Sequence, residues 1–120
     1  MSTMLLKDDG THIATHIEHA TSAVSMMRGL MLRRDIPDNY AMIFTFSKPG
    51  TVSVHMLFMR FPIDVIFLNK DKIIIDIARL NPWTGHKRVR GVTYFIEMNA
   101  GTFEKYGLVC GSQLVFDTNR

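Results

Sequence analysis

A chain of 120 residues has the length of one domain, and 47% of its residues are apolar, which is enough for a core without disulfide bonds. The single cysteine, Cys110, excludes an internal disulfide and a zinc site built mainly from thiolates, so we expect a reducing compartment. The net charge of +3 permits a polyanionic partner without implying one. We therefore predict a single domain over residues 1–120.

The sequence predicts neither a targeting signal nor a membrane span. The first residues contain no basic start followed by a long apolar stretch, as a secretory signal would. The longest apolar passages are interrupted by Arg60, Asp64 and Asp76, well short of the roughly 18 apolar residues of a membrane helix. We therefore expect a soluble, cytoplasmic protein.

The N-terminal part of the chain is predicted to form two strands and one helix. His12–Glu18 distributes its residues between two faces with a period of two, and Met4–Lys7, before a turn at residues 8–10, is its predicted hairpin partner. Ser22–Met31 has apolar residues at the spacing of one helix face, and Pro37 prevents its continuation. We therefore expect a helix here that packs across one end of the fold.

The rest of the chain is predicted to be almost entirely strands. Ser47–Gly50 has the composition of a tight turn, and Gly101–Tyr106 fits a single helical turn. The nearly uniform apolar character of Ile63–Leu68 is typical of a central strand covered on both faces. The predicted strands are Ala41–Phe46, Val52–Phe58, Ile63–Leu68, Lys72–Leu80, Val92–Met98 and Leu114–Phe116. The pattern predicts a β-sandwich or half-open barrel of about seven short strands, with one helix in the N-terminal half.

Three charged residues stand in apolar surroundings. Asp64 lies within the most apolar predicted strand, where a carboxylate costs several kcal/mol unless it is paired or hydrogen-bonded. It could be a structural anchor for backbone N–H groups or an arginine, or it could line a cleft. Arg28 and Glu97 could join Asp64 in an internal network or on the polar floor of a pocket.

The histidines and the cysteine are less specific. His12, His16 and His19 resemble a metal cluster, but in a strand His19 points away from the other two. We therefore predict a solvated face and no metal site. Cys110 has apolar neighbours and is predicted to be a small core residue, because nothing positions His55 to activate its thiol.

A connection at Asn81–Gly91 is long for a small β domain, and such loops are often functional. It contains Trp83 together with Lys87, Arg88 and Arg90. These side chains could contact phosphates and stack on a base, but a basic solvated loop is the interpretation that we favour.

Several blocks of the sequence resemble one known family. Arg28-Gly29-Leu30-Met31, Met42–Phe46, and His55-Met56 leading to Pro62–Leu68, followed by Glu97, occur in the order and spacing of the family called domain of unknown function 192. The resemblance implies a compact β fold of sandwich type with a short helix, and a family with no established activity. Where many bacterial members carry a tryptophan before the methionine, and a lysine and an asparagine after it, this chain has His55, Leu57 and Phe58.

Our leading hypothesis is a non-enzymatic module that binds an unknown small ligand or protein, with no cofactor. Arg28, Asp64 and Glu97 would form the floor of an apolar cleft, and Met31 and Met56 its adaptable walls. One alternative is an enzyme that uses Asp64 or Glu97 as a general acid or base. Another is a nucleic-acid accessory module that acts through the basic loop.

Overall fold

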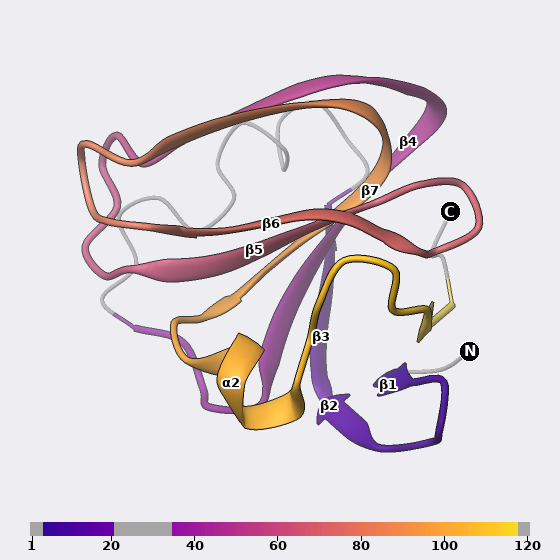
Figure 1. Cartoon of the computed structure of the whole chain (residues 1–120). Helices are drawn as coiled ribbons and strands as arrows, with labels where there is room; N and C mark the ends of the chain where they lie inside the picture. Colours follow the sequence, from indigo (N-terminus) through magenta and orange to yellow (C-terminus); the bar gives the residue numbers. More distant parts are fainter. Residues whose placement is uncertain (1–3, 21–34, 118–120) are drawn as a thin grey trace.

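The computed structural model describes residues 4–20 and 35–117, whose strands form two sheets (Figure 1). The smaller sheet has the order β2-β1-β8 and consists of β1 (Leu5–Lys7), β2 (His12–Ala14) and β8 (Leu114–Val115). The larger sheet has the order β3-β4-β7-β5-β6 and consists of β3 (His16–Ala20), β4 (Tyr40–His55), β5 (Ile63–Leu68), β6 (Ile74–Leu80) and β7 (His86–Asn99). The prediction of a mainly β protein is confirmed.

The central strands of the larger sheet are buried on both faces. In β4, Met42 and Phe44 enter one core, whereas Ala41 and Ile43 enter the other. All six residues of β5 are buried, as predicted for Ile63–Leu68. Because successive side chains of a strand point to opposite faces, the nearly continuous apolar sequence of β5 supplies both cores.

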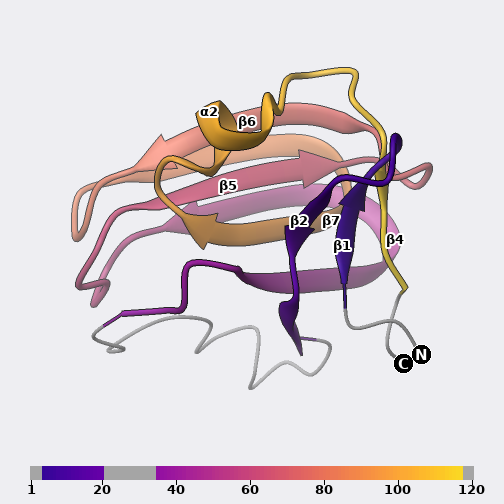
Figure 2. The same ribbon diagram turned by 90° about the horizontal axis from the view of Figure 1, so that it is seen from below.

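One face of the larger sheet is covered by the smaller sheet and by helix α2 (Thr102–Tyr106) (Figures 1 and 2). Figure 2 shows β1 and β2 running across the strands of the larger sheet. The core between them, here called the helix-side core, includes Leu5, Ile13, Ile66, Leu108 and Phe116. Helix α2 confirms the helical turn predicted near the C-terminus. No helix within residues 4–20 and 35–117 is long and apolar enough to span a membrane.

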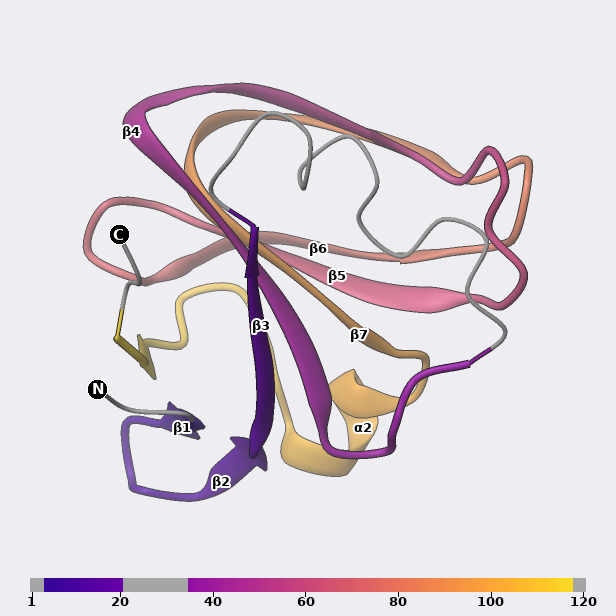
Figure 3. The ribbon, with the colours of Figure 1, turned by 180° about the vertical axis from the view of Figure 1, so that it is seen from behind.

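The opposite face is covered by a long hairpin arm. The second half of β4 pairs with the first half of β7, and together they arch over the sheet (Figures 1 and 3). We call the core beneath them the arm-side core. It includes Met42, Phe44, Val54, Met56, Val65, Phe67, Val89 and Phe95.

The arm corrects two predictions. Ser47–Gly50 is not a turn but part of β4, whose register shifts on both sides of Gly50. Such irregularities bend a strand without ending it, and they tolerate proline and glycine. The loop predicted at Asn81–Gly91 is also shorter, because β7 already begins at His86.

The N-terminal predictions have mixed outcomes. His12–Glu18 is not one strand, since the chain breaks at Thr15 and passes from β2 in the smaller sheet to β3 in the larger one. Strand β3 pairs in parallel with β4, whereas the other strand pairs are antiparallel. The helix predicted at Ser22–Met31 lies outside the described residues.

Candidate functional site

Asp64 forms a bidentate ion pair with an arginine of the neighbouring strand. It stands opposite Arg79 of β6, whose Nε lies 2.6 Å from Asp64 Oδ1 and whose Nη2 lies 3.0 Å from Oδ2. The carboxylate itself is 0% exposed, so it depends on these donors for the interactions that water would otherwise provide. The hydrogen bond with Asp64 raises the pKa of Arg79 above its ordinary value and keeps the guanidinium charged.

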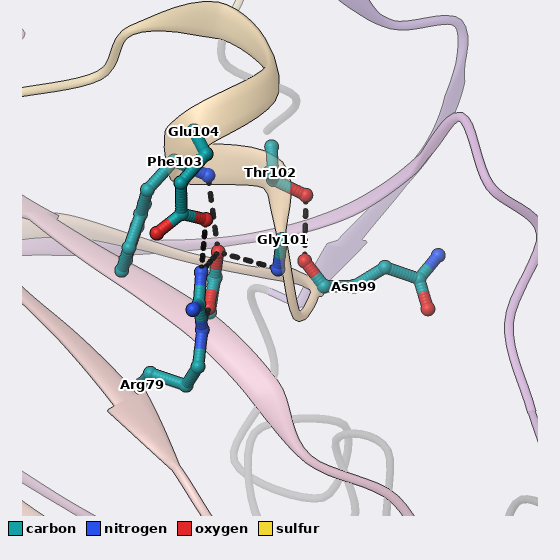
Figure 4. A network of polar contacts seen from close by, with 7 residues as sticks. Arg79, Asn99, Gly101, Thr102, Phe103 and Glu104 are labelled. Atoms are coloured by element: carbon teal, nitrogen blue, oxygen red, sulfur yellow. Dashed lines mark hydrogen bonds and ion pairs between the residues drawn. The ribbon is translucent and has the colours of Figure 1, made fainter.

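The same carboxylate also anchors the start of α2. Asp64 Oδ2 accepts the backbone N–H groups of Gly101 at 3.1 Å and Phe103 at 3.0 Å. Figure 4 shows the N–H groups of Gly101 and Phe103 at the start of α2 and the guanidinium of Arg79 meeting at one carboxylate, with Glu104 next to the arginine. Glu104 Oε1 lies 2.5 Å from Arg79 Nη2, a hydrogen bond that lowers the pKa of Glu104. Asp64 therefore has the contacts of a structural anchor.

Glu97 lies on the other face of the sheet. Asp64 stands opposite Met98, whereas Glu97 stands opposite Val65, so the two carboxylates point in opposite directions. Glu97 is buried in the arm-side core, and burial raises the pKa of its carboxyl to about 7. No hydrogen bond to Glu97 comes from a side chain in the part of the chain that the structure describes. The predicted cleft with both carboxylates on one floor is therefore corrected.

The other residues of that predicted cleft have different positions. Met56 is buried in the arm-side core, on the same side as Glu97. Arg28 and Met31 lie outside the described residues. Of the predicted set, the structure thus places Met56 and Glu97 in one core and separates Asp64 from them.

An open pocket of about 280 Å³ lies along the arm. The ring of Phe95 stacks on that of Phe44 at a centroid distance of 4.1 Å, and Phe95 precedes Glu97 by two residues on the same strand. This pocket is lined by Phe46, Thr51, Val52, Ser53 and Phe95.

A pair of exposed aromatic rings lies at the end of the arm. Trp83 and Phe58 have ring centroids 5.2 Å apart in an edge-to-face arrangement, and they are 52% and 49% exposed. Leu57 beside them is equally exposed. Both aromatic residues have a left-handed backbone, with φ of 68° and 65°, which is rare and strained for bulky side chains. We call Phe58 and Trp83 the aromatic pair.

The backbone of Met56 joins the two loops that carry this pair. Its N–H donates to Gly85 O at 3.0 Å, and its carbonyl accepts from the N–H of Trp83 at 2.8 Å and of Met59 at 3.1 Å. Gly85 has no space for a side chain, because a Cβ there would lie 2.7 Å from Asn81 O and 2.8 Å from Met56 Cγ. The loops are therefore closely packed and hold the aromatic pair in place.

Exposed basic side chains continue from the aromatic pair along the arm. His86, Arg88 and Arg90 alternate along β7 on its exposed face, and His55 and Ser53 of β4 stand opposite the first two. We call His86, Arg88 and Arg90 the cationic stripe. Lys87, which was predicted to act with the arginines, points to the other face and pairs with Asp76 at 3.3 Å.

The arm and its loops contain no acidic residue. Residues 47–62 include Lys48 and Arg60, and residues 81–95 include Lys87, Arg88 and Arg90, which makes five Lys or Arg in these two segments and no Asp or Glu. Positive charge is therefore concentrated in one region of a chain whose net charge is only +3.

The structure also places Cys110 and the three N-terminal histidines. Cys110 is exposed, so its assignment to the core is wrong; the glycines and turns around it keep it at the surface. His12 and His16 are exposed on different strands, and His19 is partly buried. Across residues 4–20 and 35–117, no three His, Cys, Asp or Glu side chains are grouped as metal ligands would be.

Sequence reasoning missed two residues that the structure makes important. Arg79 is the partner of Asp64, and the alternation of apolar and polar residues in β6 could have placed it beside β5. Phe58, the other member of the aromatic pair, lies on a different loop, 25 positions before Trp83 in the sequence. No local pattern reports such a contact.

The family model described as "Uncharacterized ACR, COG1430" (DUF192) matches residues 4–116. The chain therefore belongs to the domain of unknown function 192 family, as its motifs indicated. Among curated proteins, it is similar to a UPF0127 protein of Pyrococcus furiosus, with 34% identity over 92% of this chain and 95% of that protein. A UPF0127 protein of Thermococcus sibiricus is 29% identical over 92% of this chain and 72% of its own length.

Two solved structures share the fold. One is a protein of unknown function from Novosphingobium aromaticivorans, with a TM-score of 0.82 and 26% identity, over 94% of this chain and 82% of that one. The other, from Sinorhizobium meliloti, is described as a "putative transcription regulator"; it has a TM-score of 0.78 and 27% identity, over 93% of this chain and 89% of that one.

Proposed function

We propose that this protein is a non-enzymatic binding domain whose binding surface is the end of the arm, formed by the aromatic pair and the cationic stripe. The observation that carries the proposal is the exposure of Trp83 and Phe58, each about half accessible, beside a row of exposed cations. Exposed aromatic rings framed by polar residues are typical of interaction sites. The cleft of the original hypothesis is thereby replaced by a surface.

The surface is held in shape before any partner arrives. The Met56 backbone fixes both loops, and the left-handed backbone at Phe58 and Trp83 is a local cost that the surrounding hydrogen bonds maintain. A rigid surface loses little conformational entropy when it binds, so more of the contact energy becomes affinity.

The charge of the surface selects an anionic partner. Residues 81–95 contain Arg88 and Arg90 and no Asp or Glu, so this segment attracts an approaching anion. One structurally similar protein is described as a "putative transcription regulator", and transcription takes place on DNA, which is a polyanion. Both points support a polyanionic partner for this chain.

Binding to a sulfated polyanion tests this proposal. The doubly substituted variant Arg88→Gln, Arg90→Gln should elute from immobilised heparin at clearly lower salt than the parent. Each contact with a sulfate releases counterions, so a variant with fewer contacts gains less from their release. Lys70→Gln, Lys105→Gln is the matched control, since it also removes two exposed cations, one between β5 and β6 and one on α2. Equal elution of the double variant and the parent would contradict the proposal.

The pocket along the arm supports a second candidate, a small apolar ligand held against Phe46 and Phe95. Glu97 lies two residues from Phe95 on that strand, and its pKa of about 7 also suits a general acid or base. Val52→Phe should fill part of the pocket and weaken binding of a small fluorescent aromatic probe. Val115→Phe, on the exposed side of β8, should leave that binding unchanged.

A further inference from the structure

We infer that the partner of this surface is a single-stranded nucleic acid, whose bases stack on the aromatic pair while its phosphates follow the cationic stripe. The inference rests on the proposed binding surface and specifies its partner. It depends on the position of Phe58 and Trp83 next to the end of the stripe, where His86 and His55 face one another across β7 and β4.

The aromatic pair fits a nucleobase better than it fits a purely electrostatic partner. In the edge-to-face arrangement, the two rings leave part of their faces uncovered by each other. A base has a flat π-face of similar size, and each base stacked on a protein ring contributes about 5- to 150-fold in affinity. Sulfate groups or carboxylates alone would make no use of these faces.

The stripe fits an extended backbone. Arg88 and Arg90 are two residues apart on one face of β7, which separates them by about 7 Å along the strand. An extended polynucleotide presents one phosphate per nucleotide, so consecutive phosphates can meet consecutive arginines. The aromatic pair lies beyond the His86 end of this row, where the bases of the same strand would turn toward the protein.

A double helix suits the surface less well. Its bases are stacked on one another, so Trp83 and Phe58 could reach them only after the duplex opened. Single-stranded segments leave base faces free for aromatic side chains and are bound in this way by other proteins, with little sequence preference. We therefore expect single strands to bind more tightly than the duplex of the same sequence.

Trp83 itself reports the predicted stacking. It is the only tryptophan of the chain, so its fluorescence can be assigned without ambiguity. The intact protein is titrated with a mixed-sequence single-stranded RNA and DNA of about 12 nucleotides, within the usual range of site sizes, and with the matching duplex. We expect the single strands to quench the fluorescence of Trp83. We also expect the slope of log affinity against log salt concentration to be about 0.7 less steep for Arg88→Gln than for the parent.

Substitutions by glycine separate stacking from folding. Trp83→Gly and Phe58→Gly remove the rings at positions where glycine adopts the positive φ without strain, so the loops should keep their backbone conformation. Each should weaken binding of a labelled single strand, measured by fluorescence anisotropy, by about 5- to 150-fold. Val109→Ser, an exposed apolar residue near the C-terminus, is the control and should bind like the parent.

The outcomes distinguish this inference from the proposal beneath it. Heparin binding that depends on Arg88 and Arg90, combined with single-strand binding that neither quenches Trp83 nor responds to Trp83→Gly, would overturn the nucleic-acid inference and leave the anionic surface standing. Tighter binding to vesicles of phosphatidylserine, with a blue shift of Trp83, would also overturn it in favour of a membrane. If the arginine variants bind heparin and the oligonucleotides as tightly as the parent does, both the proposed surface and the nucleic-acid inference are rejected.

Discussion

Asp64 and Glu97 are one residue out of register on neighbouring strands, and therefore point to opposite faces of the same sheet. Both are acidic residues within apolar sequences. Asp64 receives two hydrogen bonds from Arg79 and two from the backbone around α2, whereas no described side chain donates to Glu97. The first is stabilised as a charged group, and the second has an elevated pKa because burial disfavours its charge.

Asp64→Ala should destabilise the fold strongly. The substitution leaves the N–H groups of Gly101 and Phe103 without their acceptor, and Arg79 keeps only Glu104 as a carboxylate partner among the described residues. Each buried N–H group left without an acceptor costs about 1–3 kcal/mol, so the urea midpoint should fall clearly. An unchanged midpoint would show that the network contributes nothing to stability.

Asp76→Ala provides the matched control. Asp76 also pairs with a cation across strands, but its contact with Lys87 is at the surface, where both side chains are about one third exposed. Surface pairs contribute less than about 1 kcal/mol, so this variant should unfold close to the parent. The comparison separates the effect of burial from the loss of one negative charge.

The mainly β fold was predictable because alternation is a local property. In β4 and β7 the same alternation distributes side chains between two cores. The nearly continuous apolar sequence of β5 indicates a central strand. The turn predicted at Ser47–Gly50 was wrong because proline and glycine also occur at bulges, which a sequence does not distinguish from turns.

The candidate site was less predictable because it depends on contacts between distant loops. The basic residues near Trp83 in the sequence indicate a candidate site there. Its partner Phe58 lies on another loop, which the hydrogen bonds of the Met56 backbone hold beside Trp83. Lys87 was grouped with Arg88 because they are adjacent, yet adjacent residues of a strand face opposite ways. Once β7 was known to begin at His86, the period of two would have separated them.

Glu97→Gln should change how stability depends on pH. The carboxyl of Glu97 has a folded pKa of about 7 against an ordinary value of 4.5, so the folded state holds a proton that the unfolded state releases. The free energy of unfolding that this bound proton contributes is fully present below about pH 4.5 and is lost as the pH rises through 7. The loss amounts to about 3 kcal/mol. The glutamine variant should therefore be more stable than the parent at pH 8, and similar to it at pH 4.

Urea midpoints at pH 4, 6 and 8 measure this difference. Glu104→Gln is the control, because Glu104 is exposed and its pKa is lowered by Arg79. Its pairing contributes stability above the unfolded pKa and loses it toward acid, so this variant should not gain stability over the parent at pH 8. A constant difference between Glu97→Gln and the parent at all three pH values would refute the raised pKa.

Gly85→Ala should loosen the joint between the loops that carry Phe58 and Trp83. The added Cβ would lie 2.7 Å from Asn81 O and 2.8 Å from Met56 Cγ, closer than packed atoms allow. Such overpacking costs about 1–3 kcal/mol, and it should shift the emission of Trp83 as its loop moves. Gly50→Ala is the matched control, because no atom lies within 4 Å of the corresponding Cβ. That variant should unfold within about 0.5 kcal/mol of the parent and keep its emission spectrum. If both variants behave like the parent in urea unfolding and fluorescence, the two loops are not joined tightly at Gly85, and the preorganised surface loses its support.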